Sequence, residues 1–260
     1  KTGKKFSWKM EMLVGFLPLT SKLFKNMNIQ PYIEFDKELL LKWNGSDSLF
    51  WDGFIWVTTN TYIWIPLAIV LLYVIIKNNK LQEALTIIVM IAIVITVADQ
   101  ISSGFCKPFF ARFRPTQDPE IMYQVDIVNG YRGGRYGFVS SHAANSFGLA
   151  LFLTLLIKSK LLSLILFSWA TLNAYTRIYL GVHYPGDILF GTLIGLSSAI
   201  IVYLIYKTLQ KKIFGYSRFI SSQYTESGYL KSDIRMIVTT FILTLLSIIL
   251  ISILIKESIY

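Results

Sequence analysis

The sequence predicts an all-α membrane protein, a polytopic bundle of about six transmembrane helices with an N-terminal interfacial amphipathic segment. Two observations support this prediction. Hydrophobic residues make up 54% of the 260 residues and charged residues only 15%, against a usual charged share of about 25%. The apolar residues also gather in blocks of about 20, the length at which a helix crosses roughly 30 Å of hydrocarbon.

The N-terminal part of the chain precedes the first of these blocks. Residues 1–35 are mixed and basic, and their apolar patch at 12–19 is too short to cross a membrane. Residues 36–58 are amphipathic and carry Trp43, Trp51 and Trp56, a composition typical of the membrane interface. We therefore expect residues 1–60 to form a basic, amphipathic interfacial region.

Six apolar segments follow and are expected to span the membrane: 62–76 (with apolar 54–57 just upstream), 81 to about 106, 142–158, 161–176, 187–206 and 236–255. The fifth contains Gly191-x3-Gly195, a small-residue pattern that permits close contact between helices. This divides the chain into a transmembrane core over 61–207 and a C-terminal region, 208–260, with a basic loop and the last helix.

Alternation of these spans assigns the basic connections to one face of the membrane: Lys77, Lys80, Lys158, Lys160, Lys207, Lys211, Lys212, Arg218, Lys231 and Arg235. An excess of Lys and Arg marks the cytoplasmic side. The expected location is therefore the bacterial cytoplasmic (inner) membrane, with the opposite face toward the periplasm. The lysines near the N-terminus would then lie outside, against the rule.

The net charge of +10 is explained by these membrane-flanking lysines. Because no basic run is interleaved with aromatic residues, no nucleic-acid partner is expected. The single cysteine, Cys106, excludes an intrachain disulfide. Two histidines without a His-x3-His spacing also argue against a metal site.

Polar residues at the other face form three groups in chain order: Lys107-x6-Arg114-Pro115, Val139-Ser140-Ser141-His142 and Thr176-Arg177-x5-His183-x3-Asp187. They include both histidines of the chain. Cations that neutralise a phosphoryl group, an imidazole that attacks it and a second imidazole that protonates the leaving oxygen are suited to phosphate ester chemistry.

These groups resemble the three signature motifs of the type 2 phosphatidic acid phosphatases, membrane lipid phosphatases whose site is shared with vanadium haloperoxidases. The resemblance covers roughly residues 90–205. It implies a cofactor-free, metal-independent hydrolase of a lipid phosphate or diphosphate, with the motifs in the 61–207 core. Undecaprenyl diphosphate is the first choice of substrate, and a lipid A phosphate, phosphatidylglycerol phosphate and phosphatidic acid are the alternatives.

The resemblance also implies residue roles. His183 would be the nucleophile that forms a phosphohistidine, Asp187 would hold its tautomer, and His142 would be the general acid. The phosphoryl oxygens would be bound by Lys107, Arg114, Ser140, Ser141 and Arg177. This chain departs from the family's Pro-Ser-Gly-His and Ser-Arg at Val139, Ser141 and Thr176, which affects the local backbone more than the chemistry.

Several charged residues outside the motifs have other interpretations. Arg132 and Arg135 are possible head-group contacts or solvated loop charges, Arg112 is expected to be an interface anchor, and Asp99 a partner for a nearby cation. Two other functions stay open. A haloperoxidase would share the site but is typically soluble, and a transporter would place charges across the membrane rather than at one face.

Overall fold

The computed structural model describes residues 29–213 and 221–255. The apolar patch expected at 12–19 and part of the basic loop after residue 208 lie outside these ranges. The described chain is helical, and its only β-pairings are isolated bridges between Phe113 and Tyr136 and between Tyr224 and Leu230.

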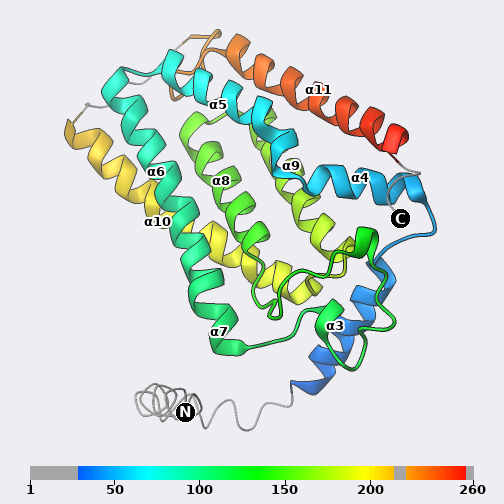
Figure 1. The fold of residues 1–260 in the computed structure, drawn as a ribbon. Coiled ribbons are helices and arrows are strands. Elements are labelled where there is room, and N and C mark those ends of the chain that lie inside the picture. Colours follow the sequence, from blue (N-terminus) through cyan, green and yellow to red (C-terminus); the bar gives the residue numbers. More distant parts are fainter. Residues whose placement is uncertain (1–28, 214–220, 256–260) are drawn as a thin grey trace, which may run out of the picture.

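The helices of the bundle are α3 (Gln30–Trp43), α4 (Leu49–Thr59), η1 (Thr61–Trp64), α5 (Ile65–Asn78), α6 (Leu81–Asp99), the π-helical η2 (Gln100–Cys106), α7 (Lys107–Phe110), α8 (Ser141–Ile157), α9 (Lys160–Tyr179), α10 (Pro185–Ile213) and α11 (Lys231–Ile255) (Figure 1). Four helical stretches are long and apolar enough to cross a membrane: Thr61–Asn78, Leu81–Phe110, Pro185–Ile213 and Lys231–Ile255. The apolar α8 is shorter, with 17 residues, and α9 has 20. Together these give the all-α bundle that the sequence predicts.

The first predicted span is present as Thr61–Asn78, but the apolar residues upstream belong to a separate helix. Residues 54–57 belong to α4, which is separated from η1 and α5 by a break at Asn60. The side chain of Asn60 accepts a hydrogen bond from the amide of Tyr62 at 3.0 Å and so caps the new helix. Because α4 packs against α9 and α11, the segment expected at the interface contributes to the bundle itself.

α8 lies at the centre of the bundle and packs against α6, α9 and α10 (Figure 1). Its contact with α10 depends on the predicted glycine pair. A Cβ atom at Gly191 would lie 2.4 Å from the carbonyl oxygen of Ser140, and one at Gly195 would lie 2.1 Å from that of Ala144. Only glycine permits this backbone approach, which holds the start of α8 against the N-terminal part of α10.

One end of the bundle gathers the basic connections. Lys77 at the end of α5 pairs with Asp233 at the start of α11 at 2.7 Å. Asn78 accepts a hydrogen bond from the amide of Leu230, and the hydroxyl of Ser227 donates to the carbonyl of Ile157. The α5–α6, α8–α9 and α10–α11 connections therefore meet at one end, as the alternation of spans predicts.

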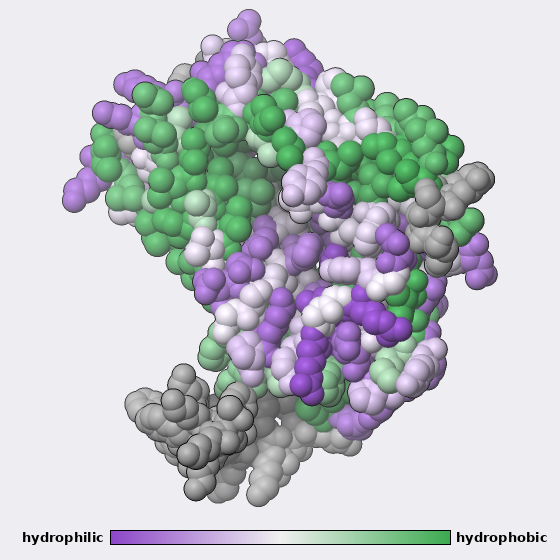
Figure 2. Space-filling view, in the orientation of Figure 1, coloured by the Kyte–Doolittle hydropathy of each residue, from purple (hydrophilic) through white to green (hydrophobic). Residues whose placement is uncertain are grey.

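The surface reflects the same division. In Figure 2 apolar residues cover the upper flanks of the molecule, over the helices, and polar residues gather over the region of the long loop. This loop runs from residue 111 to 140 and lies beside α3 (Figure 1). Lys107, just after the second predicted span, is still helical in α7.

Candidate active site

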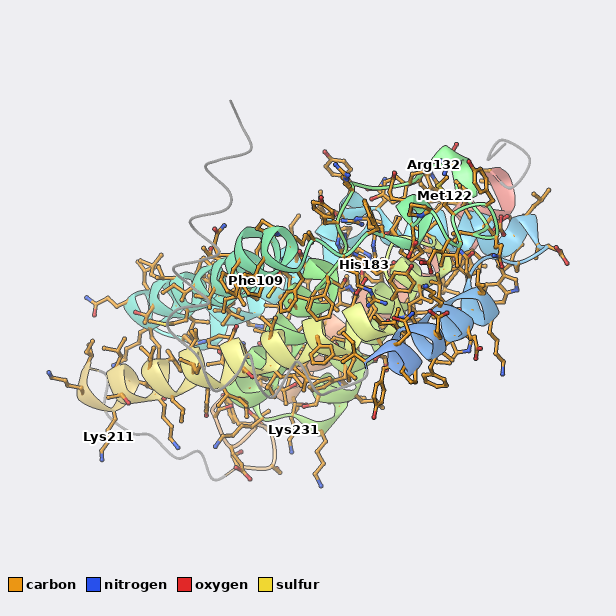
Figure 3. The ribbon with its side chains drawn as sticks, turned by 90° about the horizontal axis from the view of Figure 1, so that it is seen from below. Phe109, Met122, Arg132, His183, Lys211 and Lys231 are labelled. Carbon is orange, nitrogen blue, oxygen red and sulfur yellow. The ribbon has the colours of Figure 1, made fainter. Side chains whose placement is uncertain are left out.

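The three motifs meet at the loop-covered end of the bundle. Lys107 follows the π-helical turn at the end of α6, His142 lies in the first turn of α8, and Arg177 lies in the last turn of α9. Figure 3 shows His183 beneath the loop, far along the molecule from Lys211 at the other end of α10. The structure therefore brings together residues that are up to 80 positions apart in the chain.

His183 is buried, with 1% of its surface exposed, and is paired with Asp187. Its Nδ1 lies 3.3 Å from Oδ2 of Asp187, one helical turn further on. The same oxygen accepts the amide of Tyr184 at 3.0 Å. This contact can hold the proton on Nδ1 and leave Nε2 free to react. Burial, with the charges of Arg114, Arg177 and Lys107, lowers the pKa of His183 well below its ordinary value, so its imidazole is neutral.

Lys107 is held by two serines. Its Nζ donates to Oγ of Ser141 at 2.7 Å and to Oγ of Ser103 at 3.1 Å. Ser103 also lies 3.3 Å from a carboxylate oxygen of Asp99. Asp99, expected to be a partner for a nearby cation, therefore acts on Lys107 electrostatically and is linked to it by hydrogen bonds through Ser103. The hydroxyl of Ser141 thus accepts a hydrogen bond from Lys107, and the expected contact of the Ser141 backbone amide with phosphate stays a prediction.

Arg177 is anchored by two hydrogen bonds, but a third donor of its guanidinium has no partner among the described residues. One terminal nitrogen donates to Oγ1 of Thr59 at 2.7 Å and the other to the hydroxyl of Tyr131 at 3.0 Å. Its Nε is buried without a hydrogen-bond partner among the described residues. A buried donor without a partner costs roughly 1–3 kcal/mol. An oxygen of a bound phosphoryl group could satisfy it.

Arg114 is packed against glycine backbone. Its Nε donates to the carbonyl of Tyr136 at 3.2 Å and Nη1 to that of Val182 at 3.4 Å. A Cβ atom at Gly133 would lie 2.9 Å from Nη1 of Arg114, and Gly133 has a positive φ of 65°. Glycine at this position therefore meets both a conformational and a steric requirement of the site.

The first turn of α8 carries the second histidine. His142 is exposed, in contrast to His183, and lies within electrostatic reach of Arg177, Lys107 and Arg114. Ser140 before it is fully buried and caps the helix, accepting the amide of Ala143 at 3.4 Å. The expected contact of Ser140 with a phosphoryl oxygen stays a prediction.

Arg112 is not the interface anchor that the sequence suggests. One guanidinium nitrogen donates to Oδ1 of Asp187 at 3.0 Å and the other to Oδ2 of Asp36 in α3 at 2.7 Å. The guanidinium also lies over the ring of Tyr184, 3.9 Å from its centroid. The contact to Asp36 was missed because no sequence signal connects α3 with the motifs.

Arg132 and Arg135 are exposed on the loop above the site. The guanidinium of Arg132 donates to the carbonyl of Thr116 at 3.3 Å. That of Arg135 lies over the rings of Phe113 and Tyr136. Neither contact excludes a head group from the rest of the guanidinium, and a role in head-group binding stays a prediction.

The arrangement is suited to phosphoryl transfer. Lys107, Arg114 and Arg177 all act electrostatically on His183, so a phosphoryl group bound beside this imidazole would meet three positive charges. In the described ranges, no group of three or more His, Cys, Asp or Glu side chains is placed to hold a metal ion. The three cations would themselves stabilise the charge of a transferred phosphoryl group.

Comparison with known proteins matches the chain to one family model and to two named proteins. The family model described as the PAP2 superfamily matches residues 83–211. A protein named lipid A 4'-phosphatase from Bacteroides thetaiotaomicron is 45% identical over 182 residues, which is 69% of this chain and 80% of that protein. One of the same name from Porphyromonas gingivalis is 36% identical over 185 residues, 71% of this chain and 78% of the relative.

Among solved structures, the fold resembles that of a transmembrane PAP2-type phosphatidylglycerolphosphate phosphatase from Bacillus subtilis. The TM-score is 0.50 at 20% sequence identity, covering 81% of this chain and 98% of the other. At this identity the likeness concerns the fold alone, and it agrees with the all-α bundle described above.

Proposed function

Because the chain belongs to the PAP2 superfamily and is a membrane lipid phosphatase, we propose that its substrate is lipid A and that it removes the 4'-phosphate. The observation that supports this choice is the 45% identity to a lipid A 4'-phosphatase of which the chain covers 80%. Undecaprenyl diphosphate, the first choice from the sequence, is not confirmed, whereas lipid A was one of the alternatives considered there.

The proposed reaction begins with attack by the neutral imidazole of His183 on the phosphorus atom. A bond forms between Nε2 and phosphorus while the bond from phosphorus to the lipid oxygen breaks. His142 donates a proton to that oxygen and releases the lipid alcohol. Asp187 stabilises the positive charge on the ring through Nδ1, 3.3 Å away, and the three cations stabilise the phosphoryl oxygens.

The second half of the reaction regenerates the enzyme. His142, now neutral, takes a proton from water, and the resulting oxygen attacks the phosphorus atom of the phosphohistidine. The N–P bond breaks, and its electron pair returns to Nε2 of His183. The net reaction converts a phosphate monoester and water into an alcohol and inorganic phosphate. No cofactor takes part in either half.

The proposal is tested with the purified protein in detergent. We expect inorganic phosphate to be released from lipid A, with mass spectrometry showing the loss of one phosphoryl group from the 4' position. EDTA should leave the rate unchanged. Undecaprenyl diphosphate, phosphatidylglycerol phosphate and phosphatidic acid serve as competing substrates. Faster hydrolysis of any of these, or loss of the phosphate at the other end of lipid A, would contradict the assignment.

We also propose that the site opens toward the periplasm, because the basic connections gather at the other end of the bundle. A cysteine at Gly134, with Cys106 replaced by alanine, should react with an impermeant thiol reagent that has crossed only the outer membrane. Gly134 is exposed, and no atom lies within 4 Å of where its Cβ would be. The matched control is Lys211→Cys at the other end, which should react only after lysis. The reverse pattern would overturn this orientation.

A further inference from the structure

Asp36 of α3 is joined to the candidate nucleophile by a chain of three contacts. Its Oδ2 accepts Nη2 of Arg112 at 2.7 Å, Nη1 of Arg112 donates to Asp187 at 3.0 Å, and Asp187 lies 3.3 Å from Nδ1 of His183. Asp36 lies outside residues 83–211, the part of the chain that matches the family model. The network therefore extends from the family core into a preceding helix.

Further contacts fix the ion pair between Asp36 and Arg112 in place. The second oxygen of Asp36 accepts the amide of Gly186, next to Asp187, at 2.7 Å. A Cβ atom at Gly186 would lie 2.7 Å from Oδ2 of Asp36, so a larger residue there would collide with the carboxylate. The side chain of Asp36 is 13% exposed and that of Arg112 24%. Both therefore interact more strongly than an exposed pair would.

α3 is itself fixed in place. Lys37, buried at 7% exposure, pairs with Glu120 of the long loop. Leu40 is fully buried in a cluster with Ile121 and Tyr184. At the end of the helix, the side chain of Asn44 donates to the carbonyl of Tyr179 at 2.7 Å. These contacts hold the carboxylate of Asp36 against the start of α10.

The charges explain what Asp36 contributes. Arg112 bonded to Asp187 alone would neutralise the carboxylate that His183 needs while its ring becomes positive. Because Asp36 adds a second carboxylate to the same guanidinium, Asp36, Arg112 and Asp187 together carry a net negative charge. Burial raises the pKa of Asp36, whereas Arg112 and the amide of Gly186 favour its charged form. Asp36 thus balances Arg112 and leaves the charge of Asp187 to act on His183.

We propose that Asp36 is a positioning residue of the phosphatase, acting through Arg112 to orient Asp187 and preserve its negative charge toward His183. This rests on the proposed role of His183 as nucleophile. Outer partners that orient a metal-bound imidazole typically change activity by roughly 10–100-fold, and we expect an effect at the lower end of that range here. We expect Asp36→Asn, which keeps the size and one acceptor, to lower kcat about tenfold without changing KM.

Three variants distinguish this role from a structural one: Asp36→Asn, Arg112→Gln and the double variant, each assayed on lipid A and on a small soluble phosphate ester. If Asp36 acts through Arg112, the double variant should be no slower than Arg112→Gln alone. Asp36→Glu should restore part of the lost kcat because it restores the charge. The matched control is Glu38→Gln, an exposed carboxylate on the same helix, which should behave as wild type.

Several outcomes would overturn the inference. These are wild-type kcat in Asp36→Asn, independent losses that multiply in the double variant, a rise in KM at constant kcat, or no recovery in Asp36→Glu. A wild-type enzyme that hydrolyses no lipid phosphate, or one in which His183→Ala stays active, would instead remove the proposed function beneath it. The two failures are therefore distinguishable.

Discussion

Replacing His183 with alanine should abolish turnover of every phosphate substrate, lipid or soluble. The imidazole is buried at the meeting point of the three motifs, and its low pKa keeps it neutral and able to attack phosphorus. Without it no phosphohistidine forms, and loss of a nucleophile costs far more than a factor of about a hundred. The measurement is phosphate release at saturating substrate, with thermal unfolding of the variant as a check on its fold.

His142→Ala provides the contrast. This variant keeps the nucleophile and loses only the proposed general acid, so it should still form a phosphoenzyme from an ester whose leaving group needs no proton. Quenching in alkaline denaturant, in which the acid-labile N–P bond survives, would detect it with an ester radiolabelled in its phosphoryl group. If His183→Ala retained more than about a hundredth of wild-type activity, the roles assigned to the two histidines would be wrong. They would also be wrong if His183→Ala formed a phosphoenzyme and His142→Ala did not.

The second large effect is expected at Arg177, where lysine should lower kcat/KM about 10²–10³-fold. Arginine supplies two anchoring contacts, to Thr59 and Tyr131, and still has its buried Nε without a partner among the described residues. The single nitrogen of lysine cannot make the anchoring contacts and also bind a phosphoryl oxygen. Because lysine keeps the positive charge, a lower kcat/KM would result from the changed hydrogen-bond geometry at residue 177 and not from a change in net charge.

Phosphate release from the same lipid and soluble substrates measures this effect. Arg235→Lys is the matched control, since it makes the same chemical change at an exposed arginine in the first turns of α11. It should be indistinguishable from wild type. Wild-type kcat/KM in Arg177→Lys, or an equal loss in Arg235→Lys, would show that Arg177 does not bind the transferred group.

The fold class and the motifs could be predicted because their signals are local. Apolar blocks of transmembrane length fix the helices, and their alternation places Lys107, His142 and Arg177 at one end. The break at Asn60 was not predicted in this way, although the short polar stretch Thr58-Thr59-Asn60-Thr61 separates the two apolar runs. There the signal is a capping side chain, which acts over two residues.

The hydrogen-bond network around the candidate nucleophile could not be predicted from local sequence signals. Arg112 and Asp36 are 76 positions apart and meet only through the docking of α3 on the loop and on α10. Arg112 alone, near the end of an apolar run, has the sequence signature of an interface anchor. The resemblance also implied phosphate contacts for the hydroxyl of Ser140 and the backbone amide of Ser141, which stay predictions. What it did not indicate is that the Ser140 hydroxyl caps α8 and that the Ser141 hydroxyl holds Lys107.

The backbone contact between α8 and α10 has a mechanical consequence. Gly191 and Gly195 bring α10 against the carbonyls of Ser140 and Ala144, and a packed interior resists sliding because its atoms have no free space to enter. A thinner or thicker bilayer changes helix tilt at small energetic cost. It would rotate α8 and α10 as one rigid body, so the geometry between the two imidazoles should be insensitive to the thickness of the surrounding membrane.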